Sequence, residues 1–211
     1  TGLIKEREVR GEGVCSFADI LVRDVVYEEV SLLKRKKLHG VVGTALEKVY
    51  ADKVDEHLGE LALHFLESRE KEKALGYFLK AGEKASKVYA NNEAASYFKS
   101  ALKLLEETGG DFQERGRVLE KLGDIKGFVG DPESRLKYWN EALLLWTQLN
   151  QKEKMARLHR RISDVLYAKG DKEKAKEHLD KASKILETTP ENVELALLYM
   201  ARADEKMWYE G

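Results

Sequence analysis

Residues 117–131 read RVLEKLGDIKGFVGD and residues 157–171 read RLHRRISDVLYAKGD, so the sequence repeats itself with an offset of 40 positions. In both copies a helical apolar pattern runs up to a Gly-Asp pair, at Gly130-Asp131 and at Gly170-Asp171, and a second helical pattern follows it. A unit of two helices joined by a tight turn cannot bury its apolar face alone and must stack on its neighbours. The repeat therefore predicts an α-solenoid built from helix pairs.

The composition agrees with stacked amphipathic helices. The chain has 211 residues, of which 36% are charged, while the formal net charge is only −1, so both signs are interspersed. This balance provides no extended field of one sign and weighs against general binding to nucleic acid or to a membrane. No signal peptide and no apolar run long enough to span a bilayer is visible. The single cysteine, Cys15, excludes an intramolecular disulfide and favours a reducing, cytoplasmic compartment.

The N-terminal region differs from the rest of the chain. Residues 3–17 contain two strand-like stretches around a Gly11-Glu12-Gly13 break, which predicts a β-hairpin. Two helical patterns then follow in residues 18–50. Their apolar stripes consist of Ile20, Val25, Val26 and Val30, and of Leu32, Leu33, Leu38, Val41, Val42, Leu46 and Val49. Because helical repeats continue to the end of the chain, we expect two domains, residues 1–50 and residues 51–211.

A packing pattern recurs in the later helices. An alanine is followed by a large apolar residue and then by a second alanine in Ala74-Phe78-Ala81, Ala94-Phe98-Ala101 and Ala175-Leu179-Ala182, and Arg135-Trp139-Ala142 keeps two of the three. Small residues let neighbouring helices approach closely, and the large residue fills the space between them. We therefore expect the aromatic residues mostly in the core, with Trp146 and Trp208 partly exposed.

These residues carry a resemblance to tetratricopeptide repeats (TPR). In that family a Leu-Gly pair in the first helix precedes an alanine, an aromatic and an alanine in the second helix, and Leu122-Gly123, Trp139 and Ala142 match this pattern. The next copy departs from it, because Ser163 replaces the glycine. The resemblance covers roughly residues 55–209 and implies an all-α, right-handed α-solenoid of TPR-like helix pairs.

A second resemblance concerns the segment before the repeats. Residues 16–27, 35–39 and 55–67 look like the junction between the ATPase core, the winged helix and the repeats in AAA-type signalling ATPases with numerous domains (STAND). The resemblance implies that residues 1–50 are a winged-helix remnant whose wing is the hairpin. No Walker-type phosphate loop occurs, so an ATPase would lie outside these residues. Because the sequence begins at Thr1 without a methionine, we expect a processed product or an excised fragment.

The binding surface of a helical repeat array is normally its concave side, which the first helix of each unit lines. Mixed charge with two aromatic residues on this side suits an extended peptide or a neighbouring domain of the parent chain. The asparagines and lysines with which some TPR proteins clamp a C-terminal carboxylate are not at the matching positions, so binding to chaperone tails is disfavoured. The residues that we expect on this face are Arg117, Glu120, Lys121, Asp124, Phe128, Arg157, Arg160, Asp164 and Tyr167.

No catalytic, metal or cofactor site is predicted. His57, Glu60 and His64 lie on one helix face, but a metal needs three or four converging ligands with supporting hydrogen bonds, and these positions border a packed face. Cys15 lacks a basic neighbour that would activate its thiol. Since no nucleophile–base pair or phosphate loop is visible either, we predict that the chain is not an enzyme.

The favoured function is a scaffold for protein–protein interaction that forms the C-terminal sensor region of a signalling ATPase. A free-standing adaptor is the second hypothesis. A nucleic-acid-binding module is the third, in which the winged-helix remnant and the run of residues 34–37, KRKK, would contact phosphate. Adjacent residues point around most of a helix, so a solvated helix end or a contact to the missing ATPase domain is the preferred interpretation of this run. The apolar face of the last helix, residues 191–209, includes Leu195, Leu198 and Tyr199 and predicts self-association or further repeats.

Overall fold

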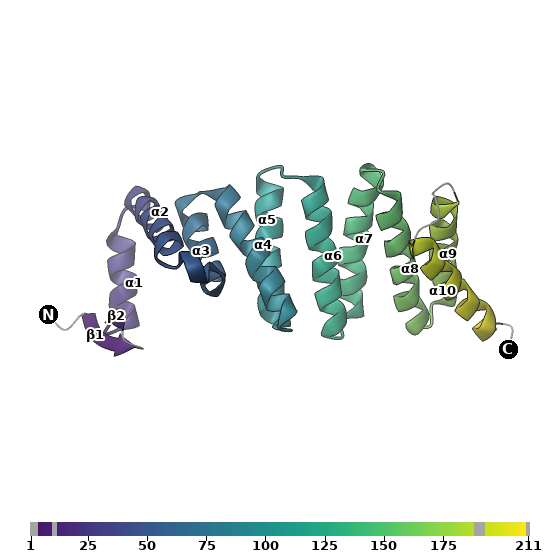
Figure 1. The fold of residues 1–211 in the computed structure, drawn as a ribbon, viewed down its shortest axis with the longest axis horizontal. Helices are drawn as coiled ribbons and strands as arrows, with labels where there is room; N and C mark the ends of the chain where they lie inside the picture. The colour runs from purple at the N-terminus through teal and green to yellow at the C-terminus, as the bar shows by residue number, and fades with distance from the viewer. Residues whose placement is uncertain (1–3, 10–11, 188–192, 210–211) are drawn as a thin grey trace. The chain divides into compact units, whose positions relative to one another are not determined.

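The computed structural model describes residues 4–9, 12–187 and 193–209. Within these ranges the chain forms two short strands, ten α-helices and one 3₁₀-helix (Figure 1). The chain divides into two compact units, Thr1–Ala74 and Leu75–Gly211, whose boundary lies inside α4 (Lys71–Lys87). The predicted all-α fold with a short N-terminal hairpin is confirmed, while the domain boundary between residues 50 and 51 stays a prediction. None of the described helices is both long and apolar enough to cross a membrane.

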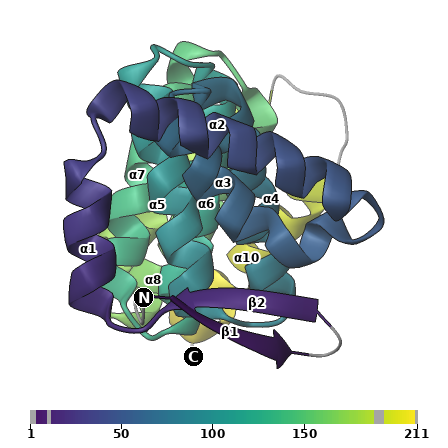
Figure 2. The ribbon, with the colours of Figure 1, turned by 90° about the vertical axis from the view of Figure 1, so that its left-hand side faces the viewer.

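The first unit begins with the predicted hairpin. β1 (Ile4–Val9) and β2 (Glu12–Phe17) pair antiparallel, with Ile4 opposite Phe17. Residues 10 and 11, between the strands, lie outside the described residues. Asp19 caps α1 (Ile20–Glu29) by accepting a 2.7 Å hydrogen bond from the Leu21 amide. In Figure 2 the hairpin lies at one end of α1, and α2 (Leu32–Val49) crosses the other end.

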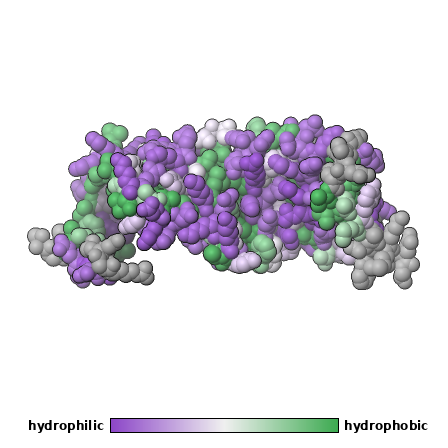
Figure 3. Space-filling model, in the orientation of Figure 1, coloured by the Kyte–Doolittle hydropathy of each residue, from purple (hydrophilic) through white to green (hydrophobic). Residues whose placement is uncertain are grey.

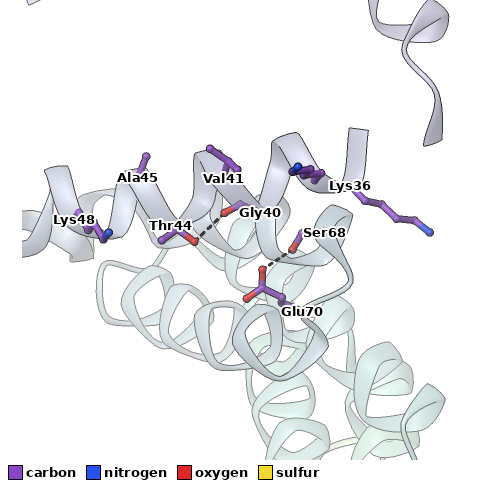
Figure 4. A pocket seen from close by; sticks show the side chains of 9 residues that line it. Lys36, Gly40, Val41, Thr44, Ala45, Lys48, Ser68 and Glu70 are labelled. Atoms are coloured by element: carbon purple, nitrogen blue, oxygen red, sulfur yellow. Dashed lines mark hydrogen bonds between the residues drawn. The ribbon is translucent and has the colours of Figure 1, made fainter. Parts of the chain in front are cut away.

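Two glycines let α2 pack closely on α3 (Leu58–Ser68), which follows the 3₁₀ segment η1 (Ala51–His57). A Cβ atom at Gly43 would lie 3.1 Å from the ring of Phe65, and one at Gly40 would lie 3.3 Å from Oε1 of Glu70. Figure 4 shows Gly40 next to Ser68 and Glu70 at this contact. The apolar face of α3 is buried and consists of Leu58, Leu61, Ala62 and Phe65.

The apolar stripes predicted in residues 20–49 are largely exposed. Ile20, Val25 and Leu33 expose 62%, 60% and 79% of their area. Figure 3 shows hydrophobic surface over α1 and α2. The helices therefore form where the pattern predicts them, but the described residues do not cover most of their apolar side chains.

The second unit consists of consecutive helices, and short turns join them from α4 to α9. After the end of α4 these are α5 (Asn91–Glu107), α6 (Phe112–Phe128), α7 (Pro132–Gln148), α8 (Lys152–Ala168), α9 (Lys172–Leu186) and α10 (Val193–Tyr209). As the repeat predicts, α6 packs on α7 and α8 packs on α9. Gly130 and Gly170 end α6 and α8 with φ of 74° and 84°, a left-handed conformation that glycine adopts without strain. Asp131 and Asp171 then cap the following helices.

The core of the second unit pairs small residues with large ones. The large members of the recurring pattern are all buried, namely Phe78, Phe98, Trp139 and Leu179. A Cβ atom at Gly123 would collide with the ring of Trp139, so only glycine allows α6 and α7 to approach this closely. In the next helix pair the equivalent positions hold Ser163 and Leu179, which combine a larger residue on α8 with a smaller one on α9.

The prediction that Trp146 is partly exposed is wrong. Its side chain is 0% exposed, because Gly116 on α6 leaves room for the ring: a Cβ atom there would lie 2.6 Å from it. The indole Nε1 donates a 2.7 Å hydrogen bond to Oε1 of Glu120, which offsets the cost of burying this N–H group. The side chain of Trp208 lies outside the described residues.

The last helix is packed on one side and exposed on the other. α10 contacts α8 and α9, and Leu198 is only 2% exposed in a cluster with Ala156 and Leu186. Leu195 packs against the same cluster. The prediction that Leu195 and Leu198 form an exposed face is therefore wrong, whereas Tyr199 is 65% exposed as expected. Residues 191 and 192, where this helix was predicted to begin, lie outside the described residues.

Candidate binding groove between helices α6 and α8

A hollow of about 580 Å³ lies between α6 and α8, the first helices of the two repeated pairs. Four residues from each helix line it, and their spacing of three or four positions places them on one helix face. From α6 these are Arg117, Glu120, Lys121 and Asp124, and from α8 they are Lys154, Arg157, Arg160 and Arg161. We call this hollow the α6–α8 groove.

Glu120 is the buried anchor of the groove. Its residue is 8% exposed, and its carboxylate accepts hydrogen bonds from Nε1 of Trp146 at 2.7 Å and from a guanidinium nitrogen of Arg157 at 2.7 Å. A carboxylate buried to this degree is tolerated only when it is paired and hydrogen-bonded. Glu120 therefore has little accepting capacity left for a ligand and serves to hold α6, α7 and α8 together.

A second paired carboxylate, Asp124, lies one helical turn further along α6. Its Oδ1 atom accepts hydrogen bonds from Nε1 of Trp139 at 3.2 Å and from Arg161 at 2.5 Å. The guanidinium groups of Arg135 and Arg161 each lie 4.2 Å from the centre of the Trp139 ring, a cation–π geometry. Burial lowers the pKa of Arg135, and the nearby Arg161 lowers it further. Asp124 and Trp139 thus orient Arg161 at the groove.

The groove has more positive than negative groups. Six of its eight lining residues are basic, and both acidic residues are already engaged. Arg117 pairs with Glu114 at 3.0 Å, and Arg160 approaches Glu194 at 3.4 Å and Asp164 at 3.7 Å. Within the described part of the chain, Lys121 and Lys154 have no carboxylate at ion-pair distance. The groove can therefore offer ammonium and guanidinium donors to an anionic group.

Lys154 is held in place by an aromatic ring. Its Nζ atom lies 3.8 Å from the centre of the Trp146 ring. Burial lowers the pKa of Lys154, and Arg117 and Arg157 lower it further, while Glu120 acts in the opposite direction. Burial and the two arginines thus disfavour the charged form of Lys154, and an added anion would stabilise it.

Six of the nine residues predicted for the binding face line this groove, namely Arg117, Glu120, Lys121, Asp124, Arg157 and Arg160. Asp164 lines an adjacent hollow of about 400 Å³ together with Arg135 and Trp139. Phe128 lies at the end of α6 and is 70% exposed, outside the groove lining. Tyr167, also outside the lining, contacts Lys172 with its ring.

Sequence reasoning missed two residues of the groove, Lys154 and Arg161. Arg161 occupies the same position in the second copy of the repeat that Lys121 occupies in the first. The 40-residue offset could therefore have predicted Arg161 from Lys121. The equivalent of Lys154 is Glu114, a residue of opposite charge, so no signal in the repeat pointed to Lys154.

The histidines considered as metal ligands have other partners. Nδ1 of His57 lies 3.1 Å from Glu60, and the His57 ring stacks on Tyr50 at 3.9 Å. Nδ1 of His64 lies 3.0 Å from Nδ1 of His39, a separation at which one neutral ring donates to the other. A group of three potential metal ligands is not present among the described residues.

The basic run Lys34-Arg35-Lys36-Lys37 is divided between different environments. Arg35 packs over the ring of Tyr27 at 4.8 Å. Lys36 and Lys37 instead line a hollow of about 640 Å³ with Lys48 and Glu70. Figure 4 shows that this hollow spans the middle of α2, where Thr44 donates a hydrogen bond to the carbonyl of Gly40. Arg35 therefore has a different environment from Lys36 and Lys37.

Comparison with known proteins identifies the fold. No protein-family model and no curated protein matches the chain. Among solved structures, aspartyl phosphate phosphatase F from Bacillus subtilis matches with a TM-score of 0.60 at 16% identity, over 86% of this chain and 47% of that one. Nearly identical TPR-like repeats of a protein described as a kinesin light chain, from Podosopora anserina, match with a TM-score of 0.58 at 13% identity, over 85% and 92% of the two chains.

A third solved structure is a signal transduction ATPase with numerous domains that carries a tetratricopeptide repeat sensor, from Pyrococcus horikoshii. It matches with a TM-score of 0.50 at 17% identity, over 89% of this chain. The match spans only 28% of the Pyrococcus chain, and the match to the phosphatase spans less than half of that protein. At these identities the likeness concerns the fold alone, which is that of TPR-like helical repeats.

Proposed function

We propose that this chain is a non-enzymatic scaffold whose α6–α8 groove binds an extended segment of a protein. The observation that carries the proposal is the groove itself, in which the first helices of two consecutive repeats turn polar and charged side chains toward a common hollow. The TPR-like fold supports it, because repeat arrays bind proteins through surfaces shared between neighbouring units. The remaining predicted residues, Phe128, Asp164 and Tyr167, would extend the contact toward the ends of α6 and α8.

We further propose that these repeats are the C-terminal sensor region of a larger cytoplasmic signalling ATPase, which a bound partner switches between an inactive and an active form. Support comes from the sequence resemblance of residues 16–27 and 55–67 to that class and from the likeness to the Pyrococcus ATPase. The hairpin, α1 and α2 would then be the end of a winged helix, and the exposed apolar side chains of α1 would contact its missing part. The ligand must prefer one of the two forms to shift the equilibrium.

Site-specific photo-cross-linking tests the scaffold. A benzophenone amino acid replaces Phe128, an exposed aromatic residue at the end of α6, and in a matched chain it replaces Lys99, an exposed lysine on α5. After irradiation in native lysate, mass spectrometry should find adducts with a segment of another protein, or of the parent ATPase, at position 128 and not at position 99. Identical adducts at both positions, or none at 128, would contradict the proposed binding face.

The ATPase assignment has a separate test. The reading frame upstream of Thr1 should encode a phosphate-loop ATPase domain followed by the first part of a winged helix. A frame without such a domain would overturn this assignment and favour a free-standing adaptor, while the groove would keep its role.

A further inference from the structure

The charges of the α6–α8 groove restrict what kind of segment it can hold. Its two acidic side chains are used internally, Glu120 by Trp146 and Arg157, and Asp124 by Trp139 and Arg161. An incoming cation would find both carboxylates of the lining already paired with arginines, and the lining holds six basic groups. Both features disfavour basic ligands and favour anionic ones.

Lys121 and Lys154 provide the contact points. Among the described residues, neither has a carboxylate at ion-pair distance, and they come from opposite walls of the groove. The ring of Trp146 holds the Lys154 ammonium in place, which reduces the entropy lost when a ligand binds it. Arg117 and Arg160 lie beside them and pair with acids outside the lining.

Those outer acids limit the length of the anionic region. Glu114 accompanies Arg117, and Glu194 and Asp164 accompany Arg160, so carboxylates border the groove. A nucleic acid carries a phosphate at every nucleotide and would meet these carboxylates on leaving the groove. A peptide with a short acidic cluster between neutral or basic residues meets the cations inside and avoids repulsion outside.

We propose that the α6–α8 groove recognises a short cluster of aspartate and glutamate side chains in an extended peptide segment, with Lys121 and Lys154 as the primary contacts and Arg117 and Arg160 as secondary ones. The inference rests on the proposed scaffold function and specifies the chemistry of its partner.

Selection from a random peptide library tests it. Peptides displayed on phage are selected on the whole 211-residue chain, on Lys121→Glu/Lys154→Glu, and on Lys99→Glu/Lys137→Glu. The last variant has the same charge change at exposed lysines of α5 and α7, and circular dichroism checks that all three chains fold. The wild type and this control should enrich peptides with clustered Asp and Glu, and the groove variant should not.

Fluorescence anisotropy with a selected peptide measures the effect. The dissociation constant should rise at least about tenfold for Lys121→Glu/Lys154→Glu and stay within about twofold for the control. A peptide whose acidic residues are changed to lysine should bind the groove variant better than the wild type. Unlabelled competitors include a phosphoserine version of the peptide and a single-stranded RNA, and the RNA should compete more weakly than the acidic peptide.

The outcomes separate the two proposals. Groove-dependent peptides without acidic enrichment, or stronger competition by the RNA, would overturn the inference about acidic segments. If groove-dependent peptides without acidic enrichment were found, the scaffold function would still stand. An absence of any peptide whose binding depends on Lys121 and Lys154 would overturn both.

Discussion

Nε1 of Trp146 on α7 donates a 2.7 Å hydrogen bond to Oε1 of Glu120 on α6, and Arg157 on α8 donates to the same carboxylate. One buried charge thereby connects three consecutive helices. Its partners cross from one repeat to the next, so the bond stabilises the α6–α8 groove as well as the helix pair α6–α7. Glu120, an acidic residue, thus holds together the helices that carry the basic residues of the groove.

Removing this carboxylate should destabilise the second unit. Glu120→Ala leaves the Trp146 N–H and the Arg157 guanidinium without their acceptor, at a cost of about 3 kcal/mol in the free energy of unfolding. Glu120→Gln keeps an oxygen acceptor for Trp146 and should cost less. Urea unfolding followed by tryptophan fluorescence measures both variants. An equal and small loss in the two would show that the carboxylate has no such role.

Any side chain added at Gly123 should lower the stability of the second unit, because it would collide with Trp139. Gly123→Ala places a methyl group into the ring of Trp139 and should cost about 1–3 kcal/mol, or more if the helices cannot move apart. Gly76→Ala is the matched control, since a Cβ atom there meets nothing within 4 Å, and this helical substitution should stabilise the fold by about 0.5–1 kcal/mol.

A double substitution tests whether the sizes of the residues at positions 123 and 139 are coupled. Gly123→Ser with Trp139→Leu copies the Ser163 and Leu179 combination of the next helix pair. The double variant should be more stable than the sum of the two single losses predicts, as measured in a double-mutant cycle. Strict additivity would mean that the two positions are not coupled.

Stability should fall in mild acid because of the histidine pair between α8 and α9. Nδ1 of His159 lies 3.0 Å from Nδ1 of His178, and burial, followed by the neighbouring His178, lowers the pKa of His159 from 6.5 to about 4. Burial lowers the pKa of His178 too. Below pH 6.5 the unfolded chain binds more protons than the folded chain, so stability present above pH 6.5 is lost progressively as pH falls to about 4.

The expected loss from His159 alone is on the order of 3 kcal/mol across this window. His159→Leu, which copies Leu119 of the preceding repeat, should flatten the pH dependence measured by urea unfolding. A wild-type profile that is flat from pH 7 to 4 would contradict the assignment.

Self-association through α10 stays a prediction. The apolar surface available for it is smaller than the sequence indicated, because Leu195 and Leu198 are packed against α8 and α9. The exposed side chains that could mediate it include Tyr199 and Met200. Sedimentation equilibrium should detect a concentration-dependent dimer in the wild type and only monomer in Tyr199→Glu/Met200→Glu. A wild type that stays monomeric over a wide concentration range would count against self-association.

Local features of this protein were predictable because short-range chemistry decides them. The Gly130 and Gly170 turns, the capping by Asp131 and Asp171, and the buried Phe98 and Trp139 all follow from backbone preference and helical periodicity. The offset between the two repeats also placed Arg117, Lys121, Arg157 and Arg160 on one face. That much of the fold and of the candidate groove is contained in the sequence by itself.

Tertiary structure alone decided how charges and aromatic rings are shared between helices. The sequence does not show that Trp146 is fully buried, because its burial depends on the space at Gly116 and on the acceptor at Glu120, both on another helix. Nor does periodicity show that Glu120 and Asp124 are used internally while Lys121 and Lys154 are not, since pairing depends on distances between side chains far apart in the chain. Helical periodicity determines which residues share a face, and only packing determines which of them remain available to a partner.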